Sequence, residues 1–428
     1  MRGARGRSVA VLAALLLLAG CGDAAPELGP TRTLAEAGAS NPTVALAPDG
    51  GVAYVAWVGT EDGRSDVWLR AVPAVGEPRS RVRVNDVPGD AQPHAQAPAR
   101  VAVGPEGNVY VAWTNATIVE GRPFPASDLR FARSTDGGRS FEPAFTVNDD
   151  HDDPGAAPAS HTFHELVVAP DGAVIVSWLD SRREWNPDGV HGAHAHAGPS
   201  FDPAVPGPDV RIAVSRDGGR SFGQSAVVDQ QACPCCRTTL AAGAGGRLHL
   251  AWRKVHEGDV RDIVVATSTD GGASFAEPHR VHEDGWVFPG CPHAGPALVV
   301  DRAGVLHAVW YTGREDRQGL HYARSTDGGR SFEAPVPLVT GGWVPPSQAS
   351  LAAGEGGAVW IAWEDRRTPE PVVRWTTLRA GEEGGSVRPA DARSVEGGHP
   401  SLAVAGGRVA LVWLEGERVL YRGGPADP

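Results

Sequence analysis

The sequence reads Ser325-Thr-Asp-Gly-Gly-Arg-Ser-Phe332, and three nearly identical octapeptides occupy residues 134–141, 215–222 and 268–275. Short Ser and Asp side chains bond to turn amides, and glycine readily adopts the positive φ that a tight turn requires. A strand-like alternation precedes the octapeptide, as in Leu320-His-Tyr-Ala-Arg324. The octapeptides therefore predict four tight turns, each joining two β-strands of a repeated unit, and turn chemistry alone accounts for their residues.

A second repeat runs through nearly the whole chain in phase with these turns. Alternating apolar residues lead into a tryptophan seven times, each time after a tight-turn signal, at Trp57, Trp113, Trp178, Trp252, Trp310, Trp363 and Trp413. Each unit thus opens with a β-hairpin and continues with a third and a fourth strand. Four antiparallel strands per unit, repeated around the chain, predict an all-β propeller, with seven blades preferred and six as the alternative.

The last unit ends after its third strand, near Tyr421. Residues Thr31 to Leu34 lie upstream of the first hairpin, where they can supply the missing fourth strand. Such a closure leaves no long open sheet edge. The predicted propeller spans residues 31–424.

The four octapeptides resemble the Asp-box, Ser-x-Asp-x-Gly-x-Thr-Trp, of bacterial neuraminidase repeats, with Ser and Phe in the last two places. The chain is therefore similar to the β-propellers of the sialidase superfamily. The resemblance implies that the boxes mark one face and that the functional site lies on the opposite face. A shared fold does not transfer an activity.

Sialidases of this superfamily use three arginines, an acid/base Asp and a Tyr activated by Glu. The segment Asn41-Pro-Thr-Val-Ala-Leu46 lacks the arginine expected early in a sialidase, and the chain has only five tyrosines. Tyr311 alone follows a repeat tryptophan toward the predicted site face, with Glu315 nearby. Because of these departures from the sialidase pattern, the resemblance assigns no catalytic residue in this chain.

Composition excludes several classes of protein. The 55 Gly and 36 Pro among 428 residues exclude a long helical bundle, while 41% hydrophobic residues indicate a packed globular chain. The formal net charge of −12 opposes binding to the phosphate backbone of nucleic acids.

Residues 1–20 have the order of an export signal, with basic residues followed by an apolar stretch from Val9 to Ala19. That stretch is too short to span a bilayer permanently. Leu18-Ala-Gly-Cys21 resembles the bacterial lipobox, which implies a lipoprotein held to a bacterial membrane through Cys21, in the periplasm or at the cell surface. Residues 21–30 then form a tether. The alternative is an ordinary cleaved signal peptide with an incidental cysteine.

Soft and borderline metal ligands occupy the connections that alternation assigns to the face opposite the Asp boxes. Cys233-Pro-Cys-Cys236 and Cys291-Pro-His293 open neighbouring units at the same position, which predicts that they lie close together. Thiolate with imidazole favours copper or zinc over calcium or magnesium. The candidate ligands are Cys233, Cys235, Cys236, Cys291, His293, His161 and His164, with His191, His194 and His196 as further donors. Disulfides remain the alternative in an exported chain, although adjacent Cys235 and Cys236 do not easily bond each other.

A second group of residues suits carbohydrate. Trp286 and Trp343 hold matching positions where exposed rings can stack on sugars, and nearby arginines suit anionic groups. The arginine candidates are Arg182, Arg237, Arg314 and Arg366. The sequence thus predicts a binding propeller with a Cys/His transition-metal site and a metal-handling or glycan partner. The alternative is an exo-sialidase-like glycoside hydrolase or a glycan-binding module.

Overall fold

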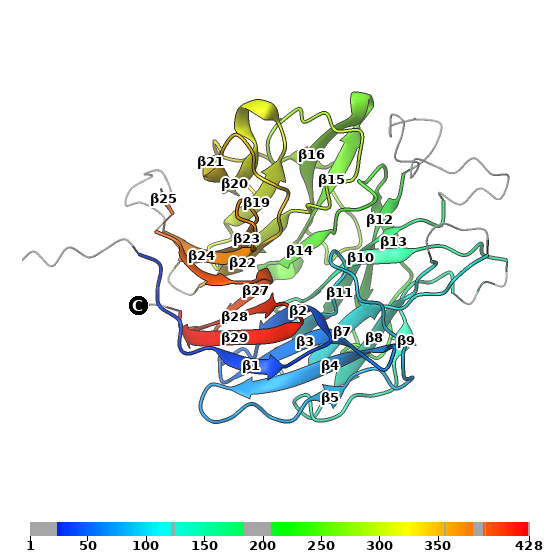
Figure 1. Cartoon of the computed structure of the whole chain (residues 1–428). Coiled ribbons are helices and arrows are strands. Elements are labelled where there is room, and N and C mark those ends of the chain that lie inside the picture. Colours follow the sequence, from blue (N-terminus) through cyan, green and yellow to red (C-terminus); the bar gives the residue numbers. More distant parts are fainter. Residues whose placement is uncertain are drawn as a thin grey trace, which may run out of the picture.

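A computed structural model describes residues 24–120, 125–151, 153, 155–183, 207–354, 357–379, 388–389 and 391–426. Antiparallel sheets are arranged in a ring (Figure 1), and the only helices in this part of the chain are the short 3-10 turns η1 (Ala244–Gly246), η2 (Glu257–Asp259) and η3 (Glu315–Arg317). None of the described helices is long and apolar enough to cross a membrane. The predicted signal segment, Cys21 and the three histidines at 191, 194 and 196 lie outside the described residues.

Each sheet is one blade, and the strands follow the chain from the inside of the ring outward. Blade 1 contains β2 (Ala39–Leu46), β3 (Val52–Glu61), β4 (Arg64–Pro73) and β5 (Val82–Arg83); blade 2 contains β6 (Arg100–Val103), β7 (Val109–Thr114), β8 (Leu129–Ser134) and β9 (Phe145–Thr146). Blade 3 contains β10 (His161–Val168), β11 (Val174–Asp180), β12 (Asp209–Ser215) and β13 (Ala226–Asp229); blade 4 contains β14 (Thr239–Ala242), β15 (Leu248–His256), β16 (Val260–Ser268) and β17 (His279–Arg280).

The remaining blades repeat the pattern. Blade 5 contains β18 (Ala297–Val300), β19 (Leu306–Thr312), β20 (Gly319–Ser325) and β21 (Val336–Thr340); blade 6 contains β22 (Ala349–Ala353), β23 (Val359–Asp365), β24 (Val372–Arg379), β25 (Arg388–Pro389) and β26 (Arg393–Glu396). Blade 7 contains β27 (Gly398–Ala405), β28 (Arg408–Glu415), β29 (Arg418–Pro425) and β1 (Arg32–Ala35). The seven-bladed all-β propeller is therefore confirmed.

The repeated tryptophans explain why the blades pack. All seven lie on the second strand of a blade and are buried, at Trp57, Trp113, Trp178, Trp252, Trp310, Trp363 and Trp413. Hydrophobic clusters extend from one blade into the next, as where Trp413 of blade 7 packs with Trp360 and Trp375 of blade 6. Burial of these large rings between sheets supplies much of the apolar area that stabilises the ring.

The N-terminal strand closes the ring, as the sequence predicts. In Figure 1, β1 (blue) lies beside β29 (red), and the antiparallel register pairs Arg32 with Tyr421. Leu34 is 2% exposed, within the cluster formed by blades 7 and 1. Part of the segment expected as a tether also packs, because Ala25 and Leu28 are buried against blades 6 and 7.

The Asp-box turns join the third and fourth strands of their blades, and their contacts are local. In the turn after β16, the Ser274 hydroxyl and amide both donate to the Asp270 carboxylate, at 2.6 and 3.0 Å. The Ser268 hydroxyl also donates to Asp270 and accepts from the Gly272 amide. Gly272 has a φ of 90°, which explains glycine at this place.

These contacts predict an acid-sensitive turn. Hydrogen bonds from Ser274 and Ser268 lower the pKa of Asp270 to about 2, so the ionised carboxylate stabilises the folded state at pH values above the unfolded pKa near 3.8. That contribution is lost as the pH falls toward 2. We expect Asp270→Asn to lower the melting temperature at pH 7, with the difference from wild type shrinking between pH 4 and pH 2. Thermal unfolding across that range is the measurement, and Glu77→Gln at an exposed position is the control; a difference that does not depend on pH would contradict the assignment.

Candidate metal site

The cysteine segment lies in the connection from blade 3 to blade 4. It is tied to the neighbouring strand β15, because the Cys233 amide donates to the Arg253 carbonyl at 2.7 Å. The Cys236 amide donates back to the Cys233 carbonyl at 3.3 Å, which folds the segment into a turn. Cys291 lies one connection further on, before β18, and Gly295 lets its segment approach closely, since a Cβ there would lie 2.5 Å from the Arg237 carbonyl oxygen. Neighbouring connections therefore meet, as their matching positions predict.

Three thiols form a compact buried group. The Sγ atom of Cys233 lies 3.6 Å from that of Cys235 and 3.4 Å from that of Cys236, and the Cys235–Cys236 distance is 4.0 Å. Ligands about 2.3 Å from a tetrahedral metal centre are about 3.8 Å from one another, so these spacings fit a shared ion. None of the four described cysteines forms a disulfide, and the three sulfur–sulfur distances given above are well above the ~2.05 Å of a disulfide.

Cys291 is the fourth sulfur beside this group. It is partly buried and packs against Cys233, Cys235, Cys236 and Val255. The Cys235 thiol hydrogen-bonds to Cys291, which helps to raise the pKa of Cys235. Three sulfurs of one connection thus form the compact group, and Cys291 of the next connection packs against it.

Two buried arginines place positive charge near the thiols. Arg261 donates from Nη1 to the Cys233 Sγ at 3.1 Å. Arg253 donates only to the main-chain carbonyls of Ala294, Arg261 and Tyr311, and it makes no ion pair with a carboxylate in the described part of the chain. Each arginine is 1% exposed. A buried cation without a carboxylate requires another anion nearby, and thiolates can supply it.

The same surroundings shift the pKa values of Cys233 and Cys236 in opposite directions. Burial raises the pKa of Cys233, but hydrogen bonds from Cys235 and Cys236 outweigh burial. The charges of Arg261 and Arg253 act in the same direction and hold the pKa of Cys233 well below its usual range. Burial and the bond to Cys233 raise the pKa of Cys236 to about 12. Of these two thiols, Cys233 is the one whose pKa its surroundings lower.

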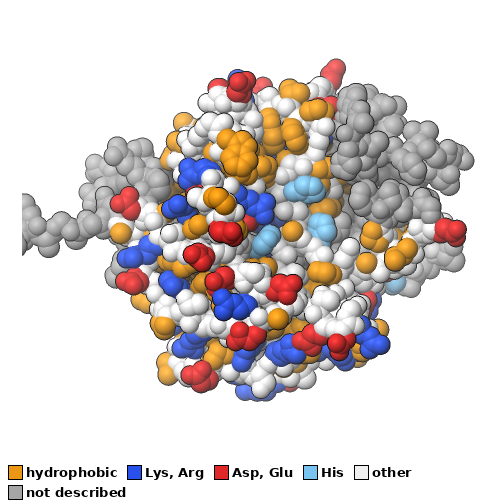
Figure 2. Space-filling model, viewed as in Figure 1, with side chains coloured by type: hydrophobic (Ala, Val, Ile, Leu, Met, Phe, Trp, Pro, Cys, Tyr) orange, Lys and Arg blue, Asp and Glu red, His pale blue; other side chains and the backbone are white. Residues whose placement is uncertain are grey.

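The described histidines are not brought into this group, which contains only the three cysteines. His293 is exposed. Burial of His94 and the nearby charge of His293 lower the pKa of His94. His164 is fully buried beside the Ala112 carbonyl, and burial lowers its pKa to about 3. Histidine side chains are visible near the middle of the face in Figure 2, apart from one another.

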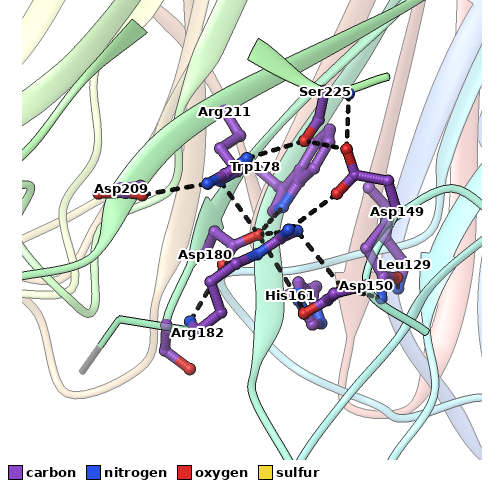
Figure 3. Close-up of polar contacts among 12 residues, drawn as sticks. Leu129, Asp149, Asp150, His161, Trp178, Asp180, Arg182, Asp209, Arg211 and Ser225 are labelled. Atoms are coloured by element: carbon purple, nitrogen blue, oxygen red, sulfur yellow. Dashed lines mark hydrogen bonds and ion pairs between the residues drawn. The ribbon is translucent and has the colours of Figure 1, made fainter. Parts of the chain in front are cut away.

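His161 lies in a separate polar network in blade 3 (Figure 3). Its Nδ1 contacts the Ser127 carbonyl at 2.7 Å, and its Nε2 contacts the Asp150 carboxylate at 3.1 Å. Arg182 joins the network by bonds to Asp180 and Asp149, at 2.8 Å each. Both ring nitrogens of His161 and the guanidinium of Arg182 are therefore occupied within the protein.

Several solved structures of other proteins are similar in fold to this chain. A polysaccharide lyase, PL25 ulvan lyase, has a TM-score of 0.55 at 12% identity over 91% of this chain and 94% of that chain. The leech intramolecular trans-sialidase has a TM-score of 0.52 at 11% identity over 92% and 93%, and a Hadza microbial sialidase 0.50 at 14% over 87% and 76%. At these identities the comparison shows a shared β-propeller fold. No family model and no curated protein matches the sequence.

In this propeller, the residues expected to suit carbohydrate differ in their exposure. Trp286 is 7% exposed and stacks on Phe288, whereas Trp343 is 66% exposed. Tyr311 is buried, and its hydroxyl donates to the Val344 carbonyl at 2.8 Å. Trp343 alone among these three rings is open to a ligand.

The arginines expected on the same face are mostly paired. Arg366 bonds to Glu364 at 2.7 Å, and Arg314 pairs with Asp316 at 2.8 Å. Arg237 donates to the Ala349 carbonyl, and burial with the nearby Arg100 charge lowers its pKa to about 9. Arg253 was not among the residues predicted from the sequence, and it lies buried on β15 directly after the repeat Trp252. The position of Arg253 next to a repeat tryptophan was the signal in the sequence that could have predicted its burial.

Proposed function

We propose that this protein binds a soft transition-metal ion, Zn²⁺ or Cu⁺, through the sulfurs of Cys233, Cys235, Cys236 and Cys291. The supporting observation is the spacing of three buried Sγ atoms at 3.4–4.0 Å. Thiolates select soft and borderline metals over the oxygen-seeking calcium and magnesium.

Charge supports the same proposal. Four thiolates around Zn²⁺, or three around Cu⁺, carry a net charge of about −2 by counting ligands. Arg253 and Arg261 supply buried positive charge near the sulfurs, part of which the Asp259 carboxylate, 3.9 Å from Arg261, offsets. The negative charge of the metal-loaded site would then offset the positive charge of the arginines. Imidazoles are not required, so His293, His161 and His164 fall outside the proposed ligand set.

The role proposed for such a site is metal binding or metal handling in an exported protein. The test is the metal content and thiol state of protein purified without chelator. We expect about one equivalent of zinc or copper per chain and four reduced cysteines in the portion after Cys21. Two disulfides and no metal, detected by mass spectrometry, would overturn the proposal and make the cysteines structural crosslinks.

The proposed location is a bacterial membrane surface, with the chain anchored through lipidated Cys21. Cys21→Ala should move the protein from the membrane to the soluble fraction, because the lipid supplies the membrane affinity. Fractionation of the full chain is the measurement, with Cys291→Ser as a cysteine variant that leaves the lipobox intact. Full membrane association of Cys21→Ala would rule out the anchor.

Glycan binding is the second candidate function. The observation that favours it is the exposed ring of Trp343, in a connection opposite to the Asp-box turns. Exposed aromatic rings of this kind can stack on the apolar faces of sugars. The solved structures of similar fold include sialidases and a polysaccharide lyase, but at identities that support the fold alone.

A further inference from the structure

We infer that the central channel binds a small inorganic oxyanion, such as phosphate or sulfate, between Arg100 and Arg237. The channel has a volume of about 330 Å³ and is lined by the inner strands of the blades. Its charged lining residues are Arg100, Glu165 and Arg237. The inference does not depend on the proposed metal site.

Arg100, the first residue of β6, is incompletely bonded. Its guanidinium lies 3.1 Å from the Glu165 carboxylate in an ion pair. Its Nε atom is buried and has no hydrogen-bond partner among the described residues. The Arg100 side chain is 13% exposed and lines the channel, where its positive charge attracts an anion.

Arg237 reaches the channel from the connection before β14. Its Nη2 donates to the Ala349 carbonyl at 3.0 Å, and no carboxylate lies within ion-pair distance of it in the part of the chain that the structure describes. Glu165 is the one carboxylate lining the channel, and it also accepts a hydrogen bond from the Leu166 amide. Two guanidinium groups and one carboxylate leave the channel with an excess positive charge.

Two serines provide neutral donors in the same channel. The Ser350 hydroxyl oxygen accepts from the Leu402 amide at 2.9 Å, and that of Ser401 accepts from the Val44 amide at 3.3 Å. Both residues line the channel, and each hydroxyl hydrogen is free to donate. Guanidinium and hydroxyl groups together are a suitable donor set for an oxyanion.

A cross-ring hydrogen bond restricts the channel to a small ligand. Gln348, just before β22 of blade 6, donates from Nε2 to the Gln96 Oε1 of blade 2 at 2.7 Å. Both side chains are buried, and Gln348 also donates to the His293 carbonyl. Because both glutamines precede inner strands, they bridge the channel at the end away from the Asp-box turns. A compact inorganic anion suits this bridged channel better than a saccharide.

The test is calorimetric titration of the full chain with inorganic phosphate and with sulfate, at constant ionic strength set by sodium chloride. We expect saturable binding at one site, weakened at least tenfold by Arg237→Gln and by Arg100→Gln. Arg64→Gln, at an exposed position on β4, is the matched control and should bind as wild type does. Glu165→Gln should bind more tightly, because it removes the acceptor that competes for Arg100.

Thermal unfolding of every variant shows whether it is folded, and the opposite directions expected for Glu165→Gln and the arginine variants cannot both arise from misfolding. Absence of binding to wild type, or equal affinity in wild type and both arginine variants, would overturn the inference. Tighter binding of glucuronate than of phosphate would overturn the assignment to an inorganic ion. The metal content of the protein is measured in a separate experiment, so a failure of anion binding would not count against the proposed thiol metal site.

Discussion

Cys233→Ser should reduce the metal content of the purified protein from about one equivalent per chain to near zero. Cys233 has the two shortest sulfur–sulfur distances in the group and contacts Arg261, so its loss removes the centre of the proposed ligand set. A serine hydroxyl is a much weaker ligand than a thiolate for a soft ion. Elemental analysis by mass spectrometry is the measurement.

The arginines provide a second arm of the same experiment. Arg261→Gln keeps all four sulfurs but removes the charge 3.1 Å from Cys233, so we expect weaker metal binding with the ligand set retained. The control is a chain beginning at residue 24, which lacks Cys21 and should keep its full metal content. Full occupancy in Cys233→Ser would contradict the sulfur site.

Metal loss should also lower stability. An ion that binds the folded state alone stabilises it by linkage, so chelator should lower the melting temperature of wild type to that of Cys233→Ser. Chelator should have no further effect on the variant. A chelator effect of equal size on both proteins would place the metal elsewhere.

Removal of β1 should destabilise the whole ring. Without this strand, β29 presents an unpaired edge, and Leu34 no longer fills the cluster between blades 7 and 1. The lost backbone hydrogen bonds and apolar burial are on the order of 5 kcal/mol in the free energy of unfolding. Because each blade is held by its neighbours, a weakened junction weakens the closed ring.

Three chains beginning at residues 24, 31 and 37 separate the contributions. The step from 24 to 31 measures the packing of Ala25 and Leu28, and the step from 31 to 37 measures β1 itself. Leu34→Ala in the full chain should cost about 2–4 kcal/mol, as expected for truncation of a buried leucine. Denaturant unfolding is the measurement, and equal stability of the chains beginning at 31 and 37 would show that β1 does not close the ring.

The blade count and the closure could be predicted from sequence because both follow from local, periodic signals. Tryptophan positions and Gly-containing turns repeat once per blade, and a final unit with three strands identifies the N-terminal segment as its fourth. The grouping of Cys233 with Cys291 was likewise predictable, since equal positions in adjacent repeats are neighbours in a ring.

Which side chains meet across blades became clear only from the packing of the folded chain. His161 and Cys233 belong to similar connections, yet His161 is bound within blade 3 by Asp150 and Ser127. Arg261 contacts the Cys233 thiol from a buried strand position, and Gln96 meets Gln348 from the far side of the ring. Local periodicity in the sequence was enough to specify the repeat, and hence the strands, the turns and the order of blades. The partners of each buried polar group depended on the packing of blades distant in sequence, because no local pattern encodes the direction of a side chain across an interface.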